Sequence, residues 1–386
     1  MNTKKFRTKT EIIARDNGKI NGLWEIALDL GYSAVKLFSP NIIASFPSYA
    51  KRVEKDFQYA GNAPAESILY KDLDTEEMWL VGEVAQNMMT SGDTSDSEMS
   101  LYGRERYGNP MFSVLVRAGL GLGMQENEFG APGSSKITVQ TGLPEKYLSN
   151  DTNDLKECIA GKHHFALKIG REEWCIFDFE IAAEDIYVMS QPKGSLFSVC
   201  IEKNGQFHPD AKKYLNSSIL VFDPGFGTLD LFPIKSGVVG RGETNPVLGM
   251  KRVLQETAKL IKENYNIEVL IPEMQKYLNT GIVRSYDRKN LKSKEYPFDK
   301  YLQTANELIC QEAITWLTSV VNLIDYNYMI ITGGTGAAWD AMIRDRFKEF
   351  STLKLISGNQ NDQLPLIYSN VRGYYLYRYN KLGNAQ

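Results

Sequence analysis

The two stretches WEIALDLGYSAVKLF (residues 24–38) and SILVFDPGFGTLDLFPI (residues 218–234) share one pattern, and that pattern decides the fold. Each contains a strand of β-branched and aromatic residues, a tight turn with glycine, and a second strand. A third strand is expected after each pair, at residues 42–50 and 238–240. The two antiparallel meanders begin 194 residues apart, about half the chain. The sequence therefore predicts a duplicated, two-domain α/β architecture.

Helices are expected between these strands. Asn245 is a predicted N-cap with Pro246 at the first helical position, and the apolar residues up to Ile261 fall on one helical face. A second helix is expected at residues 301–324. The strand YMII (residues 328–331) then leads into the turn TGGTG (332–336) and another helix from residue 337. Residues 91–108 and 281–296 are predicted to be exposed loops.

Composition is ordinary for a globular protein of 386 residues, with 43% hydrophobic and 24% charged residues. A net charge of −3 and a pI near 5.9 argue against a broad basic face that grips nucleic acid. The four cysteines and three histidines show no metal-binding spacing. Residues 1–22 are basic and polar without the apolar segment of a secretory signal, so we expect a loosely packed arm and a cytoplasmic protein.

The chemistry is expected at the turns. Backbone N–H groups in tight glycine turns can converge on phosphate oxygens without a P-loop. Asp29 precedes the first turn and Asp223 the second, each at the end of an apolar strand where an unpaired carboxylate is costly. A hydrated Mg²⁺ between the two turns would explain both aspartates, because magnesium keeps several of its waters. Lys36 lies on the outgoing strand of the first turn.

The order DLGYSAVK (residues 29–36), DPGFGTLD (223–230) and ITGGTG (331–336) resembles the phosphate-1, phosphate-2 and adenosine motifs of the actin/Hsp70/sugar-kinase superfamily. Within it, the chain is most similar to the bacterial actin-like plasmid-segregation proteins, the ParM and Alp group. The segments WLVGEVA (79–85), TVQTGLPEKY (138–147) and YSNVRGYY (368–375) support this resemblance, which covers residues 23 to 380.

The resemblance implies an actin-like fold, with two duplicated ribonuclease-H-like domains around a nucleotide cleft. The expected boundaries are 1–22 for the arm, 23–190 for domain I, 191–365 for domain II and 366–386 for a segment returning to domain I. Asp29 and Asp223 would organise Mg²⁺ through water and polarise the attacking water, which makes both catalytic residues. Gln191 would position that water. The residues implied to bind ATP, or GTP, are Gly31, Tyr32, Ser33, Lys36, Gly225, Phe226, Gly227, Thr228, Gly333, Gly334 and Thr335.

The implied function is a slow ATP hydrolase that polymerises into dynamic filaments and segregates plasmid DNA through a DNA-binding adaptor protein. Turnover is expected to be slow because a glutamine such as Gln191 is a poor proton acceptor. A sugar-type kinase would need an acceptor pocket with an aspartate base, and no motif for one stands out. An Hsp70-like chaperone normally carries a long extension after the ATPase core. A non-hydrolysing actin-like scaffold is a further alternative, against which Gln191 argues.

Overall fold

The computed structural model describes residues 2–88, 104–287 and 289–383, and these form two compact units. The larger unit contains residues 8–88, 104–215 and 358–383. The smaller unit contains residues 2–7 and the described part of 216–357. Each unit encloses its own cluster of buried apolar side chains, so each has the core expected of a domain.

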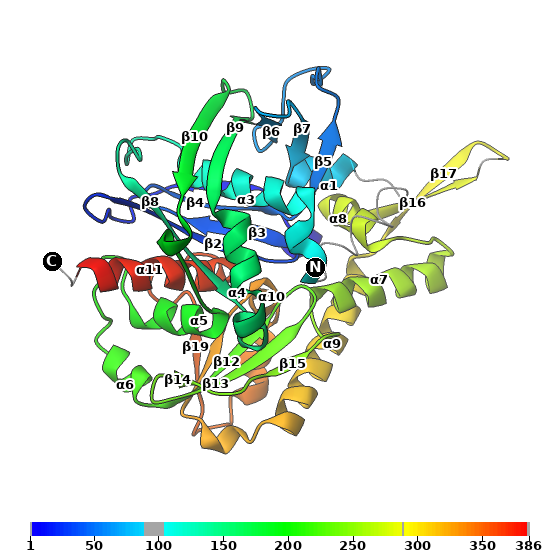
Figure 1. Cartoon of the computed structure of the whole chain (residues 1–386). Helices are drawn as coiled ribbons and strands as arrows, with labels where there is room; N and C mark the ends of the chain where they lie inside the picture. Colours follow the sequence, from blue (N-terminus) through cyan, green and yellow to red (C-terminus); the bar gives the residue numbers. More distant parts are fainter. Residues whose placement is uncertain (1, 89–103, 288, 384–386) are drawn as a thin grey trace. The chain divides into compact units, whose positions relative to one another are not determined.

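The larger unit is built on a six-stranded sheet in the order β1-β4-β3-β2-β8-β11 (Figure 1). The strands are β1 (Glu11–Ala14), β2 (Leu23–Leu30), β3 (Ala34–Phe38), β4 (Ile42–Pro47), β8 (Lys136–Leu143) and β11 (Ile186–Ser190). β2, β3 and β4 form an antiparallel meander, and β8 and β11 run parallel to β2. The meander predicted for residues 24–50 is confirmed, with its third strand ending at Pro47.

Helices cover both faces of this sheet. α3 (Pro110–Gly123) lies against Leu28 of β2 at Gly119, where an added Cβ would be 3.1 Å from the leucine side chain. α11 (Ser369–Gly383) reaches the opposite face, where Arg378 lies 3.5 Å from the buried Glu25 of β2. Side chains an odd number of positions apart in a strand point to opposite faces of the sheet. Glu25 and Leu28 are three positions apart, so α11 and α3 cover opposite faces. α4 (Glu145–Ile159) packs beside β8 and β11.

A second sheet of the larger unit has five antiparallel strands in the order β10-β9-β6-β7-β5. Its strands are β5 (Ala50–Val53), β6 (Ile68–Asp72), β7 (Met78–Val81), β9 (Gly161–Ile169) and β10 (Cys175–Ile181), and α1 (Glu83–Met88) follows β7. Ile68 and Tyr70 of β6 belong to the core cluster of the unit. α3 packs against this face as well, because a Cβ at Gly121 would meet Phe165 and Leu167 of β9.

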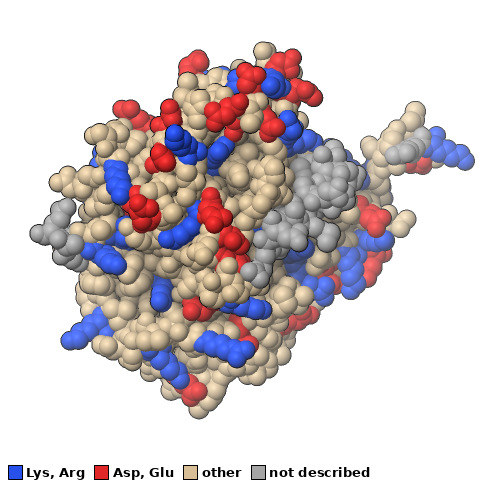
Figure 2. Space-filling model, viewed as in Figure 1, with Lys and Arg blue, Asp and Glu red and all other residues tan. Residues whose placement is uncertain are grey.

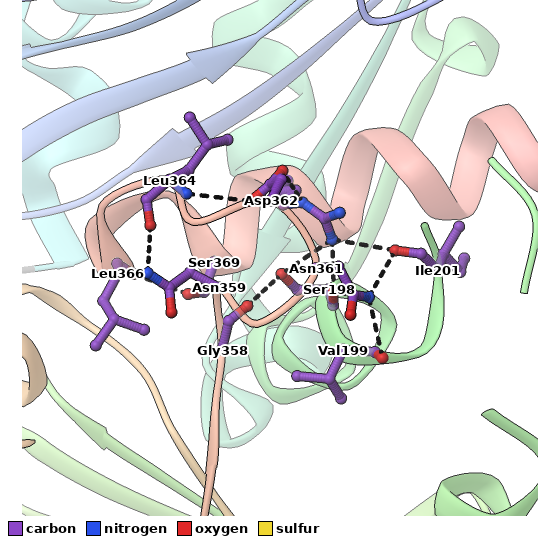
Figure 3. Close-up of polar contacts among 11 residues, drawn as sticks. Ser198, Val199, Ile201, Gly358, Asn359, Asn361, Asp362, Leu364, Leu366 and Ser369 are labelled. Carbon is purple, nitrogen blue, oxygen red and sulfur yellow. Dashed lines mark hydrogen bonds and ion pairs between the residues drawn. The ribbon is translucent and has the colours of Figure 1, made fainter. Parts of the chain in front are cut away.

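The C-terminal segment is anchored to the end of α5 (Gln191–Cys200), as Figure 3 shows. The side-chain amide of Asn361 donates to the carbonyl oxygens of Ser198, Val199 and Ile201 at 3.0–3.2 Å. The buried Arg372 of α11 donates to Ser198 and Ile201 as well and pairs with Asp362. These donors satisfy carbonyls that the end of a helix leaves unpaired. They fix the connection between β19 and α11 to the larger unit. α6 (Ala211–Leu215) belongs to this unit as well.

The smaller unit has a sheet in the order β14-β13-β12-β18-β19, with β15 paired to β13. Its strands are β12 (Ser218–Pro224), β13 (Leu229–Lys235), β14 (Val238–Val239), β15 (Glu243–Asn245), β18 (Tyr328–Ile331) and β19 (Lys354–Ser357). Its helices are α7 (Met250–Tyr265), α8 (Ile271–Thr280), α9 (Asp299–Val320) and α10 (Gly334–Phe347). Trp339 of α10 is buried and donates to Asn306 of α9 at 2.9 Å, which fixes these two helices together.

The duplication predicted from the sequence is visible in the topology of the two sheets. β4-β3-β2-β8-β11 in the larger unit and β14-β13-β12-β18-β19 in the smaller unit have the same order. In both, an antiparallel pair is followed by two strands parallel to its first strand. The strands predicted at residues 218–223, 228–234 and 328–331 are confirmed as β12, β13 and β18, and α9 and α10 follow where helices were expected.

Two local predictions are wrong. α7 begins at Met250 and not beside Asn245. The Asn245 side chain instead accepts from the N–H groups of Val247 and Leu248 at 3.1 and 3.2 Å, which makes a turn after β15. Residues 281–296 are not a loop, because β16 (Ile282–Asp287) and β17 (Lys292–Pro297) pair as an antiparallel hairpin.

The expected arm at residues 1–22 is also more ordered than predicted. Thr3 and Phe6 are buried in a short 3₁₀ helix, and the Thr3 hydroxyl donates to the carbonyl of Leu278 at 2.7 Å. β1 pairs with β4 within the main sheet of the larger unit. Of the predicted loop 91–108, only residues 104–108 are described, as a 3₁₀ turn. Among the helices that the structure describes, none has the length and apolarity needed to span a membrane.

Candidate functional site

The first predicted turn connects β2 and β3 in the larger unit. Asp29 and Lys36 lie opposite each other on these strands, and the lysine Nζ is 3.1 Å from the aspartate Oδ2. The Asp29 side chain is only 6% exposed and the Lys36 side chain 15%. Because an ion pair with so little solvent is weakly screened, the two groups hold each other in place.

Side chains from outside the turn fix its backbone. The Ser48 hydroxyl donates to the carbonyl of Gly31 at 2.7 Å, and the Ser48 N–H donates to the carbonyl of Ser33 at 3.0 Å. Arg106 donates to the carbonyl of Leu30 at 3.0 Å and lies 5.1 Å from the ring centre of Tyr32. The turn is therefore held in one conformation. Sequence analysis missed both supporting residues, since nothing in the local sequence of Ser48 or Arg106 indicates this role.

The second predicted turn connects β12 and β13 in the smaller unit, and it closes with a 2.8 Å hydrogen bond from the Gly225 N–H to the Thr228 carbonyl. Asp223 is paired in register with Asp230 on the opposite strand. Asp230 accepts from the hydroxyls of Thr228 and Thr244 at 2.8 and 2.6 Å. Burial raises the pKa of Asp230 above its usual value, although the two hydroxyl donors oppose the shift. Sequence analysis did not select Asp230, although it ends the quoted motif.

The third predicted turn lies against the second. Gly333 has φ 78° and ψ 159°, a conformation open essentially to glycine alone. A Cβ at this position would be 2.6 Å from Oδ1 of Asp223 and 2.7 Å from the carbonyl of Pro224. The Thr335 hydroxyl donates to the carbonyl of Gly225 at 2.7 Å. The structure thus brings the second and third predicted motifs together within the smaller unit, with Gly334 opening α10.

The second turn also rests on the beginning of α7. The N–H groups of Met250 and Lys251 donate to the carbonyls of Gly225 and Phe226 at 3.2 and 2.8 Å. Gly249 allows this approach, since a Cβ there would lie 2.7 Å from the Phe226 carbonyl. A Cβ added at Gly227 would meet no atom of the described residues within 4 Å, so this part of the turn is open.

Gln191 is the first residue of α5, directly after β11. β2, β8 and β11 are parallel, and their registers place Asp29 level with Met189. Neighbouring strands are about 4.8 Å apart, so the backbones of these two residues are separated by about 10 Å. Gln191 therefore begins its helix at the same edge of the sheet as the first turn. It is partly exposed.

Two buried hydroxyls beside the predicted residues lack a hydrogen-bond partner among the described residues. Ser190 precedes Gln191, and Thr332 precedes the Gly333–Gly334 turn; their side-chain oxygens are enclosed and unpaired. Such groups are normally satisfied, so these two hydroxyls stand out beside the predicted residues. No set of three or more His, Cys, Asp or Glu side chains suited to a metal occurs in the part of the chain that the structure describes. A magnesium ion held by two aspartates through water requires no such set.

Comparisons with known proteins give one family match and several similar folds. Residues 27–194 match the family model of the N-terminal domain of actin-like proteins. The fold is similar to a non-polymerisable quadruple mutant of pCBH ParM, with a TM-score of 0.67 and 17% identity over 94% of this chain and 100% of the other.

Two further structures share the fold. One is the protomer of a 15-stranded ParM filament from Clostridium botulinum, with a TM-score of 0.63 and 19% identity over 93% of this chain and 99% of the other. The second is an archaeal actin homologue in complex with ADP, with a TM-score of 0.58 and 14% identity over 94% of this chain and 100% of the other. No curated protein sequence matches the chain. The expected actin-like α/β fold is confirmed.

Proposed function

We propose that the chain is an actin-like protein of the ParM/Alp type that hydrolyses ATP slowly and assembles into nucleotide-dependent filaments, because residues 27–194 match the N-terminal domain of actin-like proteins and the whole chain has a ParM-like fold. The observation that carries the nucleotide part is the packing of Gly333 and Thr335 against Asp223 and Gly225. The second and third motifs, about 110 residues apart, thereby pack together around Asp223.

The turns are proposed to bind the phosphates of ATP through their backbone N–H groups. The residues concerned are Gly31, Tyr32 and Ser33 of the first turn and Gly225, Phe226, Gly227 and Thr228 of the second. Lys36 would add its positive charge, and its 3.1 Å pairing with Asp29 keeps the ammonium group near the first turn. Gly333, Gly334 and Thr335 are proposed to lie beside the adenosine. GTP offers the same phosphates, so the choice of base is part of the test.

Asp29 and Asp223 are proposed to hold Mg²⁺ through water, which suits a small oxygen-seeking cation. When bound, the metal would neutralise negative charge on the phosphates. The chain's own residues would then orient the attacking water: Asp223 as hydrogen-bond acceptor and Gln191 as a positioning amide. An amide does not take up the proton efficiently, and this predicts slow hydrolysis.

Self-association is the proposed output of this cycle. The ParM and Alp12 structures with the same fold include filaments. A heterologous contact between identical copies does not close on itself and therefore produces an open filament. The β16–β17 hairpin is a candidate contact region, because it extends from the helices of its own unit and exposes 61% of Tyr286 and 77% of Leu291 (Figure 1). A two-stranded hairpin is marginally stable alone and gains from such a contact.

Plasmid DNA is proposed to be bound through an adaptor protein. The net charge of −3 gives little attraction for DNA. On the face shown in Figure 2, lysine and arginine are interspersed with aspartate and glutamate and do not form a continuous basic surface. The adaptor would supply the DNA-binding part, and the filament the motion.

Light scattering and pelleting across protein concentration test the proposal. We expect assembly above a critical concentration with Mg–ATP and disassembly as nucleotide is consumed. Replacing Tyr286 and Leu291 by serine should raise the critical concentration, while Ile324→Ser, at an equally exposed site of the same unit, should not. A chain that stays monomeric at tens of micromolar with a non-hydrolysable ATP analogue contradicts the filament proposal. Assembly at that concentration requires an association free energy of about −6 to −7 kcal/mol per contact. Phosphate transfer to a sugar would then indicate a kinase.

A further inference from the structure

A cavity of about 620 Å³ lies in the larger unit, on the five-stranded sheet, and it shares no lining residue with the three glycine turns. It is open to solvent on one side and is lined by strands β6, β7 and β9, by the connection between β5 and β6, and by the turn between β9 and β10; these elements are at the top of Figure 1. None of its lining residues belongs to the proposed nucleotide site. Its volume is within the range of about 300–1,000 Å³ that is typical of small-molecule sites.

The register of the strands explains how the floor of the cavity forms. Leu69 pairs with Lys168, and Lys71 pairs with Met78, so these four side chains share one face of the sheet. The opposite face carries Tyr70 and its neighbours into the main core. Leu69 and Met78 are nevertheless only 7% and 5% exposed, because the segment before β6 covers them.

A glycine closes one end of the cavity. Gly170 has φ +55°, and a Cβ there would be 2.7 Å from the carbonyl of Ala65. Its N–H donates to the carbonyl of Ser67 at 2.8 Å. A larger residue would force the covering segment away, so this enclosure is built into the backbone.

Positive charge dominates the lining. Four cations line the cavity: Lys55, Lys71, Lys168 and Arg171. Lys55 is paired at 3.1 Å with Glu76, which does not line the cavity, and the other three make no ion pair with any residue that the structure describes. Asp56 is the one carboxylate in the lining. Cations gathered against an apolar floor attract an anion more strongly than the same charges on open surface.

Aromatic rings form the remaining wall. Phe57, Tyr59 and Trp174 line the cavity, and the first two meet edge to face at a centroid distance of 5.2 Å. Flat rings of this kind stack on other planar groups. The Tyr59 hydroxyl is a neutral donor and acceptor at neutral pH, and burial raises its pKa further above the ordinary value.

We propose that this cavity is a binding site for a small organic anion in which a carboxylate, sulfonate or phosphate is attached to an aromatic ring. The ring lies among Phe57, Tyr59 and Trp174, and the anionic group is bound by Lys71, Lys168 and Arg171. The proposal does not depend on nucleotide hydrolysis or filament formation, because its residues are separate from those of the glycine turns.

The fluorescent anion 8-anilinonaphthalene-1-sulfonate is a suitable probe, since it combines a sulfonate with aromatic rings and accepts energy from tryptophan. The full chain is saturated with Mg–ADP and titrated with the probe under excitation of tryptophan. The Lys71→Gln/Lys168→Gln double variant should bind about tenfold more weakly, as expected for the loss of charge-assisted hydrogen bonds. Lys162→Gln removes an exposed charge from the same strand outside the cavity, and it should leave the affinity unchanged.

Two further measurements keep the test decisive even if the double variant folds poorly. In the unmodified chain, raising the salt concentration should weaken the sulfonate but not the uncharged analogue N-phenyl-1-naphthylamine. Trp174→Phe keeps an aromatic wall and should reduce energy transfer at nearly constant affinity. The proposal is overturned by any of three results. They are the same salt dependence for both probes, a loss of affinity in Lys162→Gln as large as in the double variant, and unchanged energy transfer in Trp174→Phe.

Discussion

Gly333 offers a direct test of the site geometry, through its replacement by alanine. The backbone there has φ 78° and ψ 159°, and holding a residue with a side chain in this region costs about 1–3 kcal/mol. The new Cβ would also lie 2.6 Å from Asp223 Oδ1 and 2.7 Å from the Pro224 carbonyl, so one of these groups must move. We expect Gly333→Ala to destabilise the protein by at least about 2 kcal/mol and to displace the Asp223 carboxylate.

Gly22→Ala is the matched control. Gly22 has a similar φ of +74°, but no described atom lies within 4 Å of its added Cβ, so this variant reports the cost of a side chain at positive φ without the clash. Urea unfolding of both variants separates the two contributions. In an Asp223→Ala background the carboxylate contact is absent, and the cost of Gly333→Ala should fall by about 1 kcal/mol.

Phosphate release provides the functional readout. Gly333→Ala should slow hydrolysis strongly, whereas Gly22→Ala should hydrolyse ATP at nearly the normal rate. If Gly333→Ala is as stable and as active as the unmodified chain, the close packing of the third turn on Asp223 is wrong. The argument that these motifs form one site in the smaller unit would then fail.

Three other predictions concern single side chains. Asp223→Ala should stay folded by circular dichroism and lose hydrolysis, and normal phosphate release would refute the assignment of Asp223. Gln191→Ala should bind nucleotide within a few-fold of normal and turn over about 10²-fold more slowly; a loss of affinity at unchanged turnover per bound nucleotide would make Gln191 structural. Burial lowers the pKa of His163 to about 4, so the unfolded chain takes up a proton first as the pH falls below about 6.5. Between pH 6.5 and 4, the free energy of unfolding of the unmodified chain should therefore fall by up to about 3 kcal/mol more than that of His163→Gln, as measured by urea unfolding. The control His164→Gln, at the exposed neighbour, should show the same fall as the unmodified chain.

The repeated meander could be predicted because its signals are local. Alternating apolar residues determine the strands, and the glycines of DLGYS and DPGFG mark where the chain turns. The strand and glycine turn ending at residue 336 are equally local. The start of α7 could not be predicted in this way. Asn is a residue type that often caps helices, but the pairing of β15 with β13 holds Asn245 in a strand. Its side chain accepts the N–H of Val247 and so stabilises the turn that follows.

The supports of the turns depend on contacts far along the chain, which explains why sequence analysis missed them. Ser48 and Arg106 reach the first turn from positions 17 and 76 residues beyond the groups they bond. Asp230 becomes distinctive only through its register opposite Asp223 and the two hydroxyls around it. None of these partners is specified by a neighbouring residue. Their selection required the tertiary structure.

The two turns share a sequence pattern but are stabilised differently, so they depend on their glycines to different degrees. Charged and hydroxyl side chains hold the first turn, where a Cβ at Gly31 would meet the Lys36 Nζ at 2.8 Å. Backbone N–H groups of α7 and the Thr335 hydroxyl hold the second, and a Cβ at Gly225 would meet only Thr228, at 3.3 Å. Enlarging Gly31 must therefore disturb the ion pair with Asp29, whereas enlarging Gly225 leaves its aspartate in place. Matching positions of the duplicated motif are consequently not equivalent, and the first turn depends more strongly on its glycine.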